Sequence, residues 1–229
     1  HGVMMGKVVF DAQKEACCNY PDYEQVNYVN QVSCKEVIRY NEGAGKKVVL
    51  IDCGVKANIL RLLLKREVEV IRVPWDYDFH ALHYDGLFIS NGPGDPDICE
   101  ATVWNIRRAM QDERLPIFGI CMGNQLLAKA GGASVYKLKY GHRSHNQPVR
   151  MVGTNRCFIT SQNHGYAVDS DTLAGEWEPW FVNMNDGSNE GIRHRTNPWF
   201  SVQFHPEAAS GPTDTAFLFD KFVELIKNR

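Results

Sequence analysis

Apolar segments of strand type alternate with helical segments from Lys47 to Ala130, and this alternation limits the possible folds more than any other feature of the chain. The predicted strands cover residues 47–53, 68–73, 86–90 and 116–120, and the predicted helices cover residues 58–66, 102–110 and 125–130. Strands separated by helices indicate an α/β fold with a mostly parallel sheet flanked by helices. Ligands of such folds bind at the carboxyl ends of the strands. The residues that directly follow each strand are therefore the first candidates for a functional site.

The segments on either side of this region have other patterns. Residues 1–45 are polar and weakly periodic, so we interpret them as a linker outside a domain at 46–229. Within this linker, residues 26–32 alternate between polar and apolar types and predict an edge strand. Residues 134–204 contain short strand patterns and turns, which predict an extension of the sheet. The apolar spacing of residues 213–227 predicts a closing helix.

Composition excludes several classes of function. The 229 residues carry a formal net charge of −2, which predicts no binding to nucleic acid. No apolar run approaches the roughly 20 residues that span a bilayer, and no signal peptide is recognisable, so we expect no membrane association. The seven cysteines are odd in number and form no Cys-x-x-Cys pair, which argues against a disulfide framework or a zinc site. We therefore expect a reduced, cytoplasmic protein without a bound metal.

One cysteine lies where the strand–helix alternation predicts a site. Cys121 directly follows the strand at 116–120 and precedes the helix at 125–130, with Gly119 and Gly123 two residues to either side. The pattern is typical of a nucleophile elbow, in which glycines permit a tight turn and the nucleophile lies at its apex. The N-terminus of the following helix favours the thiolate, which is the nucleophilic form of cysteine.

His205 and Glu207 supply the partners that such a cysteine needs. An imidazole accepts the thiol proton and returns it to a leaving group, and a carboxylate holds the imidazole and favours its charged form. Residues two apart on an extended segment point to the same side, so we expect Glu207 to flank His205 while both face Cys121. Each motif alone also occurs as plain structure, but together they predict a catalytic site of Cys121, His205 and Glu207.

Two further segments allow either a structural or a functional interpretation. The turn at 91–96 is either a plain glycine–proline turn or a loop that stabilises an oxyanion, with N–H donors at Gly92 and Met122. It is not a phosphate loop, because the Lys-Ser/Thr ending is missing. The segment at 162–166 is either a hairpin end or part of the site, and His164 by itself is more typical of a structural residue.

Taken together, these segments resemble the class I, triad-type glutamine amidotransferases, which have a flavodoxin-like fold, and among them the glutaminase chains of carbamoyl-phosphate synthases. The resemblance is carried by Ser90–Pro96, Gly119–Gln125, Tyr140–Val149, Thr160–Val168, Asn185–Gly191 and Gln203–Glu207. The motifs around Cys121 and His205 are common to all triad amidotransferases. Residues 145–148 and 162–165 are similar to the carbamoyl-phosphate members in particular.

The resemblance implies a reaction and a set of site residues. Cys121 attacks the side-chain amide of glutamine, His205 protonates the departing ammonia, and water hydrolyses the resulting γ-glutamyl thioester. The implied oxyanion donors are Gly92 and Met122. The positions that hold glutamine are, by the same resemblance, Gly92, Gly94, Met122, Gln125, Asn163, Gly165 and Tyr166.

The resemblance also implies a partner. In the family, ammonia passes to a large synthetase subunit that uses ATP, Mg²⁺ and bicarbonate to make carbamoyl phosphate for pyrimidine and arginine biosynthesis. This chain has no ATP-binding motif of its own, so we expect it to carry no cofactor. Small chains of the family have a further N-terminal domain, of which residues 1–45 are interpreted as a linker or remnant. Asn124 stands where the family commonly has histidine, at a position outside the triad.

Three other functions remain as alternatives. The first is the amidotransferase component of another pathway, such as anthranilate or GMP synthesis, and residues 145–148 argue against it. The second is a non-catalytic module with the same fold, and the retention of Cys121 and His205 argues against it. The third is a peptidase-like or γ-glutamyl hydrolase, which would not need the segments at 92–94 and 162–165 together.

Overall fold

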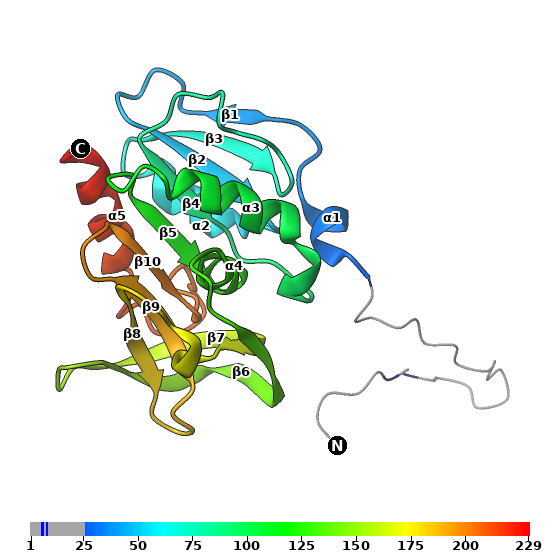
Figure 1. Cartoon of the computed structure of the whole chain (residues 1–229), viewed down its shortest axis with the longest axis vertical. Coiled ribbons are helices and arrows are strands. Elements are labelled where there is room, and N and C mark those ends of the chain that lie inside the picture. Colours follow the sequence, from blue (N-terminus) through cyan, green and yellow to red (C-terminus); the bar gives the residue numbers. More distant parts are fainter. Residues whose placement is uncertain (1–5, 7, 9–25) are drawn as a thin grey trace, which may run out of the picture.

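Five parallel strands form the centre of a ten-stranded mixed sheet (Figure 1). The computed structural model describes Gly6, Val8 and residues 26–229. The parallel strands are β2 (Lys47–Asp52), β3 (Glu69–Pro74), β4 (Gly86–Ile89), β5 (Ile117–Ile120) and β10 (Trp199–Val202). Their spatial order, β3–β2–β4–β5–β10, is the flavodoxin-like order 2-1-3-4-5. The predicted fold class and the four predicted strands of the first half are confirmed.

Two pairs of helices cover the two faces of these strands. They are α2 (Ala57–Leu64) and α5 (Phe217–Lys227) on one face, and α3 (Glu100–Ala109) and α4 (Met122–Ala130) on the other (Figure 1). Alternate residues of β2 enter opposite cores: Val48 and Leu50 pack in the cluster that contains α2 and α5, and Val49 packs with α3 and α4. Burial on both faces explains why these strands have continuous apolar sequences.

The second half extends the sheet with antiparallel strands, as predicted. These strands are β6 (Val135–Met151), β7 (Cys157–Val168), β8 (Trp177–Asn183) and β9 (Asn189–His194). Short 3-10 turns, η3 (Pro96–Ile98) and η4 (Ser170–Thr172), lie in the connections. β6 and β7 are long rather than short, and the register of their pairing shifts twice. Register shifts bend a hairpin, and one of them follows Lys137 and spans Gly141, where φ is +70°.

The predicted edge strand at 26–32 is wrong, because Tyr28–Val32 forms a short helix, α1. The side chain of Asn27 accepts a hydrogen bond from the N–H of Asn30 (2.8 Å) and caps the helix. The edge strand is instead β1 (Ile38–Tyr40), which pairs antiparallel with β3. Within the segment interpreted as a linker, β1 is therefore part of the sheet, and Val29 of α1 is buried in the core. Residues 1–5, 7 and 9–25 of that segment lie outside the described residues, and the domain boundary stays a prediction.

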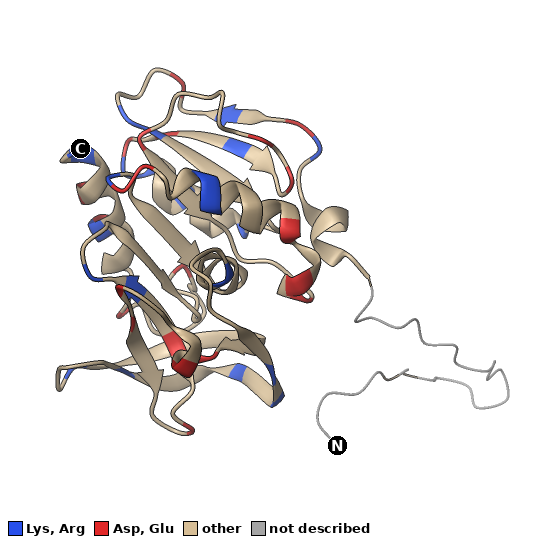
Figure 2. Ribbon diagram, in the orientation of Figure 1, with Lys and Arg blue, Asp and Glu red and all other residues tan. Residues whose placement is uncertain are grey.

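Charged residues of both signs are interspersed over the described ribbon rather than sorted by element (Figure 2). Within this part of the chain, none of the helices has both the length and the apolar character needed to cross a membrane.

Candidate active site

The carboxyl ends of three neighbouring strands meet at one pocket. Gly92 follows β4, Cys121 follows β5 and His205 follows β10, and β5 lies between the other two strands. The pocket has a volume of about 810 Å³. All of the predicted site residues except Glu207, which lies behind His205, line this pocket. Tertiary structure therefore brings together the residues that the sequence places far apart.

Cys121 lies at the apex of a strained turn. Its backbone has φ +55° and ψ −101°, a conformation that L-residues rarely adopt. The N–H of Cys121 donates to the carbonyl of Val202 (2.8 Å), which ties the turn to β10. The side chain is buried, 5% exposed, directly before the first turn of α4. The predicted elbow is present.

The flanking glycines allow the tight turn because a Cβ at either position would clash, as expected. Neither Gly119 nor Gly123 has positive φ; the unusual backbone is that of Cys121 itself. A Cβ at Gly119 would overlap the carbonyl of Gly123, and a Cβ at Gly123 would overlap the carbonyl of Ile89. The glycines therefore provide space for α4 to begin against β4 and β5, rather than conformational freedom.

His205 and Glu207 form a buried ion pair behind the thiol. Nδ1 of His205 lies 2.7 Å from Oε1 of Glu207, and the two side chains are 4% and 1% exposed. Burial by itself would lower the pKa of His205, but the charge of Cys121 and its hydrogen bond, followed by those of Glu207, outweigh burial and raise this pKa to about 9. Burial likewise opposes ionisation of Glu207, yet His205 and Lys56 hold the pKa of its carboxyl below the usual value.

The pairing of His205 with Glu207 does not arise from an extended segment. Residues 206 and 207 form a turn, closed by a hydrogen bond from the N–H of Ala208 to the carbonyl of His205 (3.1 Å). Pro206 has the fixed φ that suits the second position of such a turn. The predicted contact is present, but the turn, not strand alternation, produces it.

Lys56 is a site residue that the sequence interpretation missed. Its Nζ lies 3.2 Å from Oε1 of Glu207 and 3.1 Å from Nδ1 of His205. Lys56 is the residue before α2, and its half-exposed side chain reaches the pocket from another strand end. No local motif marks such a lysine, because the contact spans 149 positions of the chain.

The predicted oxyanion positions, Gly92 and Met122, line the same pocket as Cys121. Met122 is the first residue of α4, so its N–H has no acceptor within the helix. A Cβ at Gly92 would overlap the carbonyl oxygen of Cys53, so only glycine lets this loop approach the end of β2. Gly94 has φ +89°, which also favours glycine.

Gln203, a second residue that was missed, joins the thiol to α4. Its Nε2 lies 3.7 Å from Sγ of Cys121, and its Oε1 accepts from Nδ2 of Asn124 (3.1 Å) and Nε2 of Gln125 (3.2 Å). The hydroxyl of Ser201 donates to Oδ1 of Asn124 (2.8 Å). Asn124, fully buried, therefore connects α4 to β10 and has no direct contact with the pocket.

One wall of the pocket, the β7 wall, is formed by residues of β7. Asn163, Gly165 and Tyr166 line the pocket from this strand. The carbonyl of Tyr166 accepts from Nε2 of Gln125 (3.3 Å), and its hydroxyl donates to Oδ2 of Asp95 (3.0 Å). These contacts link the β7 wall to α4 and to the loop after β4.

Comparisons with known proteins agree with this geometry. The family model for glutamine amidotransferase class-I matches residues 49–225. The carbamoyl phosphate synthase arginine-specific small chain of Neosartorya fischeri is 51% identical over 221 residues, which cover 95% of this chain and 48% of that protein. The multifunctional protein CAD of Squalus acanthias is 49% identical over 99% of this chain, which covers 10% of that protein. The chain thus spans about half the length, or less, of these relatives.

Two solved structures show the same fold. A protein of Thermoplasma acidophilum that is assigned to GMP synthase superposes with a TM-score of 0.69 at 24% identity, over 80% of this chain and 94% of that one. A glutamine amidotransferase of Thermotoga maritima gives a TM-score of 0.58 at 19% identity, over 80% of this chain and 83% of that one. With a family match over most of the chain and an elbow cysteine in the pocket, this protein belongs to the class I glutamine amidotransferases.

Proposed function

We propose that this chain is the glutamine-hydrolysing part of a carbamoyl-phosphate synthase. The observation that carries the proposal is the buried His205–Glu207 pair beside the strained elbow of Cys121, which combines a nucleophile with a base held in one orientation. The relatives at 49–51% identity are named as carbamoyl phosphate synthase small chains and as CAD, which supports the choice of pathway.

In the proposed reaction, the Cys121 thiolate attacks the side-chain carbonyl carbon of glutamine and a carbon–sulfur bond forms. The N–H groups of Gly92 and Met122 stabilise the oxyanion that develops on the carbonyl oxygen. When the carbon–nitrogen bond breaks, His205 gives its proton to the nitrogen, and ammonia leaves. A raised pKa keeps His205 protonated at neutral pH, which suits this step.

Water completes the cycle. His205, now neutral, accepts a proton from water as the water attacks the γ-glutamyl thioester. The carbon–sulfur bond breaks, glutamate is released, and the thiolate of Cys121 and the imidazolium of His205 are restored. Glu207 holds Nδ1 of His205 throughout, so that Nε2 is the nitrogen that exchanges protons.

The ammonia would pass to a synthetase partner that uses ATP and Mg²⁺, and this chain would need no cofactor for glutamine hydrolysis. A cytoplasmic, reducing setting suits a catalytic thiol, and Cys34, Cys53, Cys99, Cys121 and Cys157 are all free. Assignment to GMP synthesis has weaker support, since the likeness to the Thermoplasma structure at 24% identity concerns the fold alone.

The test measures glutamate release from glutamine by the chain, alone and with a carbamoyl-phosphate synthase large subunit. We expect wild type to release glutamate, the large subunit to bind and accelerate release, and Cys121→Ser to release none. Unchanged release by Cys121→Ser would refute the mechanism. Failure of the large subunit to bind, with intact glutamate release, would refute the pathway and leave the chemistry standing.

A further inference from the structure

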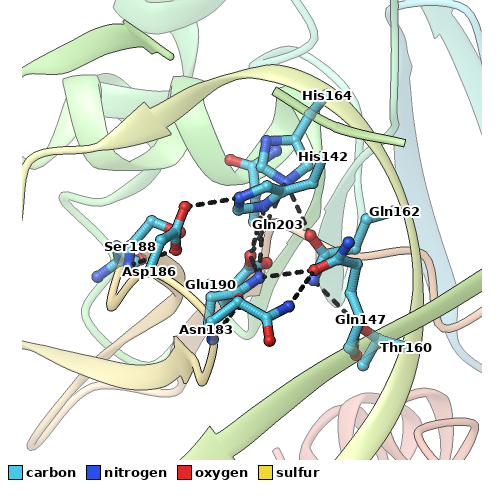
Figure 3. A network of polar contacts seen from close by, with 12 residues as sticks. His142, Gln147, Thr160, Gln162, His164, Asn183, Asp186, Ser188, Glu190 and Gln203 are labelled. Atoms are coloured by element: carbon cyan, nitrogen blue, oxygen red, sulfur yellow. Dashed lines mark hydrogen bonds and ion pairs between the residues drawn. The ribbon is translucent and has the colours of Figure 1, made fainter. Parts of the chain in front are cut away.

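Two histidines and a glutamate converge behind the β7 wall, outside the proposed catalytic machinery (Figure 3). His142 comes from β6, His164 from β7 and Glu190 from β9, so three strands supply the group. The side chains of Glu190 and His164 are 0% and 1% exposed, and that of His142 is 11% exposed. The fold thus brings these three residues, which are distant in sequence, together in a nearly solvent-free environment.

The distances between the three groups match the edges of a metal coordination shell. Nδ1 of His142 lies 3.2 Å from Nε2 of His164 and 3.1 Å from Oε1 of Glu190, and the remaining edge measures 3.9 Å. Atoms at these separations leave room between them for an ion bonded to each at about 2.0–2.1 Å, the length of zinc–nitrogen and zinc–oxygen bonds.

Outer partners orient each ligand as they do in metal sites. Nε2 of His142 donates to Oδ2 of Asp186 (2.9 Å), which leaves Nδ1 to face the centre of the group. Nδ1 of His164 donates to the carbonyl of Tyr166 (2.8 Å), which leaves the lone pair of Nε2 facing the same centre. Nδ2 of Asn183 donates to Oε1 of Glu190 (2.9 Å). Carboxylate–histidine and carbonyl–histidine pairs of this kind are typical second-shell contacts of zinc.

Around the centre of this group, hydrogen-bond acceptors outnumber the donor hydrogens that could satisfy them. Oε2 of Glu190 is buried and has no hydrogen-bond partner. Oε1 of Gln162 lies 3.1 Å from Nε2 of His164, so two acceptors face each other. Reversing the amide of Gln162 would only move the conflict to Thr160, because the hydroxyl of Thr160, which now accepts from Nε2 of Gln162 (3.0 Å), already donates to the carbonyl of Gln147 (2.9 Å). The single N–H at Nδ1 of His142 cannot satisfy all of these acceptors, whereas a cation can.

We propose that Nδ1 of His142, Nε2 of His164 and the carboxylate of Glu190 bind one zinc ion. Two neutral imidazoles and one carboxylate are a donor set that suits Zn²⁺. Binding displaces the proton on Nδ1 of His142, and the half-exposed carboxylate of Asp186 marks the side from which the ion enters. Because His164 also lines the pocket between Asn163 and Gly165, the ion would fix the β7 wall to β6 and β9.

The test uses the purified chain after treatment with a chelator, with ZnCl₂ and, as a spectroscopic probe, CoCl₂. We expect one zinc per chain by elemental analysis after gel filtration, visible absorption from cobalt bound without octahedral symmetry, and a higher Tm with zinc than without. Glu190→Gln keeps the shape of the side chain and removes its charge, and His142→Asn removes one ligand. Both should reduce affinity more than Asp186→Asn, for which a loss of roughly 10–100-fold is expected.

Two matched variants separate this site from other zinc ligands. His83→Asn removes an exposed histidine elsewhere, and Cys121→Ser removes the thiol in the pocket. Both should bind zinc as wild type does. Loss of binding in Cys121→Ser, or binding unchanged by Glu190→Gln and His142→Asn, would overturn the proposal. None of these readouts requires glutamine hydrolysis, so the outcome is independent of the function proposed above.

Discussion

The amide nitrogen of Gln203 lies 3.7 Å from the sulfur of Cys121, while the amide oxygen of the same side chain accepts two hydrogen bonds from α4. Gln203 is fully buried, so these contacts are shielded from water. One side chain thus fixes both the thiol and the helix whose N-terminus faces it.

Gln203→Leu should slow the reaction and destabilise the fold. The change leaves the buried amide group of Asn124 without its acceptor, which costs about 1–3 kcal/mol, and removes the donor to the thiolate, whereas Gln125 keeps its bond to Tyr166. We expect slower alkylation of Cys121 by iodoacetamide and a lower urea midpoint. Gln203→Glu keeps the acceptor but places a buried carboxylate beside the thiol, so it should not restore thiol reactivity. Equal alkylation rates in all three proteins would show that Gln203 does not act on the sulfur.

Gly92→Ala should strongly reduce the kcat of glutamine hydrolysis. The new Cβ would overlap the carbonyl oxygen of Cys53, so the loop with the proposed oxyanion donor must move away from β2. Loss of one oxyanion donor costs roughly 10²–10³-fold in kcat. Gly45→Ala is the matched control, because its Cβ meets nothing within 4 Å and its φ is not positive. Comparable kcat values for the two variants would contradict the role of Gly92.

Glu207→Gln should lower kcat by about 10²-fold or more, because a neutral amide neither stabilises the imidazolium nor enforces its tautomer. The carboxylate is 1% exposed and pairs with His205 and Lys56, so the change also leaves two cations without their buried partner. Steady-state kinetics should show the loss mainly in kcat, with KM for glutamine little changed. A defect confined to KM would instead assign Glu207 to substrate binding.

His205 should titrate far above an ordinary histidine. Its pKa is raised to about 9, and the charge of Cys121 is the largest contribution in that direction. In Cys121→Ser the pKa should fall, since burial then opposes the charged imidazole with less compensation. NMR titration of the imidazole resonances measures the pKa of His205 in wild type and in Cys121→Ser. Equal pKa values in the two proteins would show that the charge of Cys121 does not act on His205.

The same shift makes stability depend on pH. Because the pKa of His205 is higher in the folded state than the ordinary 6.5, its contribution is fully present below pH 6.5 and is lost as pH rises towards 9. The contribution is on the order of 3 kcal/mol at its maximum. Urea unfolding at pH 6 and pH 9 should show a larger loss of stability in wild type than in Cys121→Ser. A larger loss of stability in Cys121→Ser than in wild type would contradict the assignment of this pH dependence to His205.

Local patterns were sufficient for β2 to β5, for α2 to α4 and for the elbow. Apolar runs bounded by turn residues predict where β2, β4 and β5 end, and the residues after those ends line the pocket. Local patterns failed where two local preferences competed. Residues 26–32 alternate as a strand does, yet capping by Asn27 and burial of Val29 among α3 and the sheet favoured a helix. The pairing of His205 with Glu207 was expected for the wrong reason, since a turn at Pro206 produces it.

By itself the sequence indicated the order of elements, the elbow at Cys121 and the neighbouring His205 and Glu207, because each of these motifs consists of residues that are adjacent or follow one strand end. Only the tertiary structure decided what surrounds them. Lys56 reaches His205 across 149 positions, Gln203 reaches Cys121 across 82, and Glu190 reaches His142 across 48. Such contacts depend on how strands pack side by side and how the β6–β7 hairpin bends. Residues brought together in this way have no fixed spacing in the sequence. The proposed zinc ligands therefore form no recognisable metal-binding motif in the sequence, although they lie beside a pocket whose residues the sequence predicts.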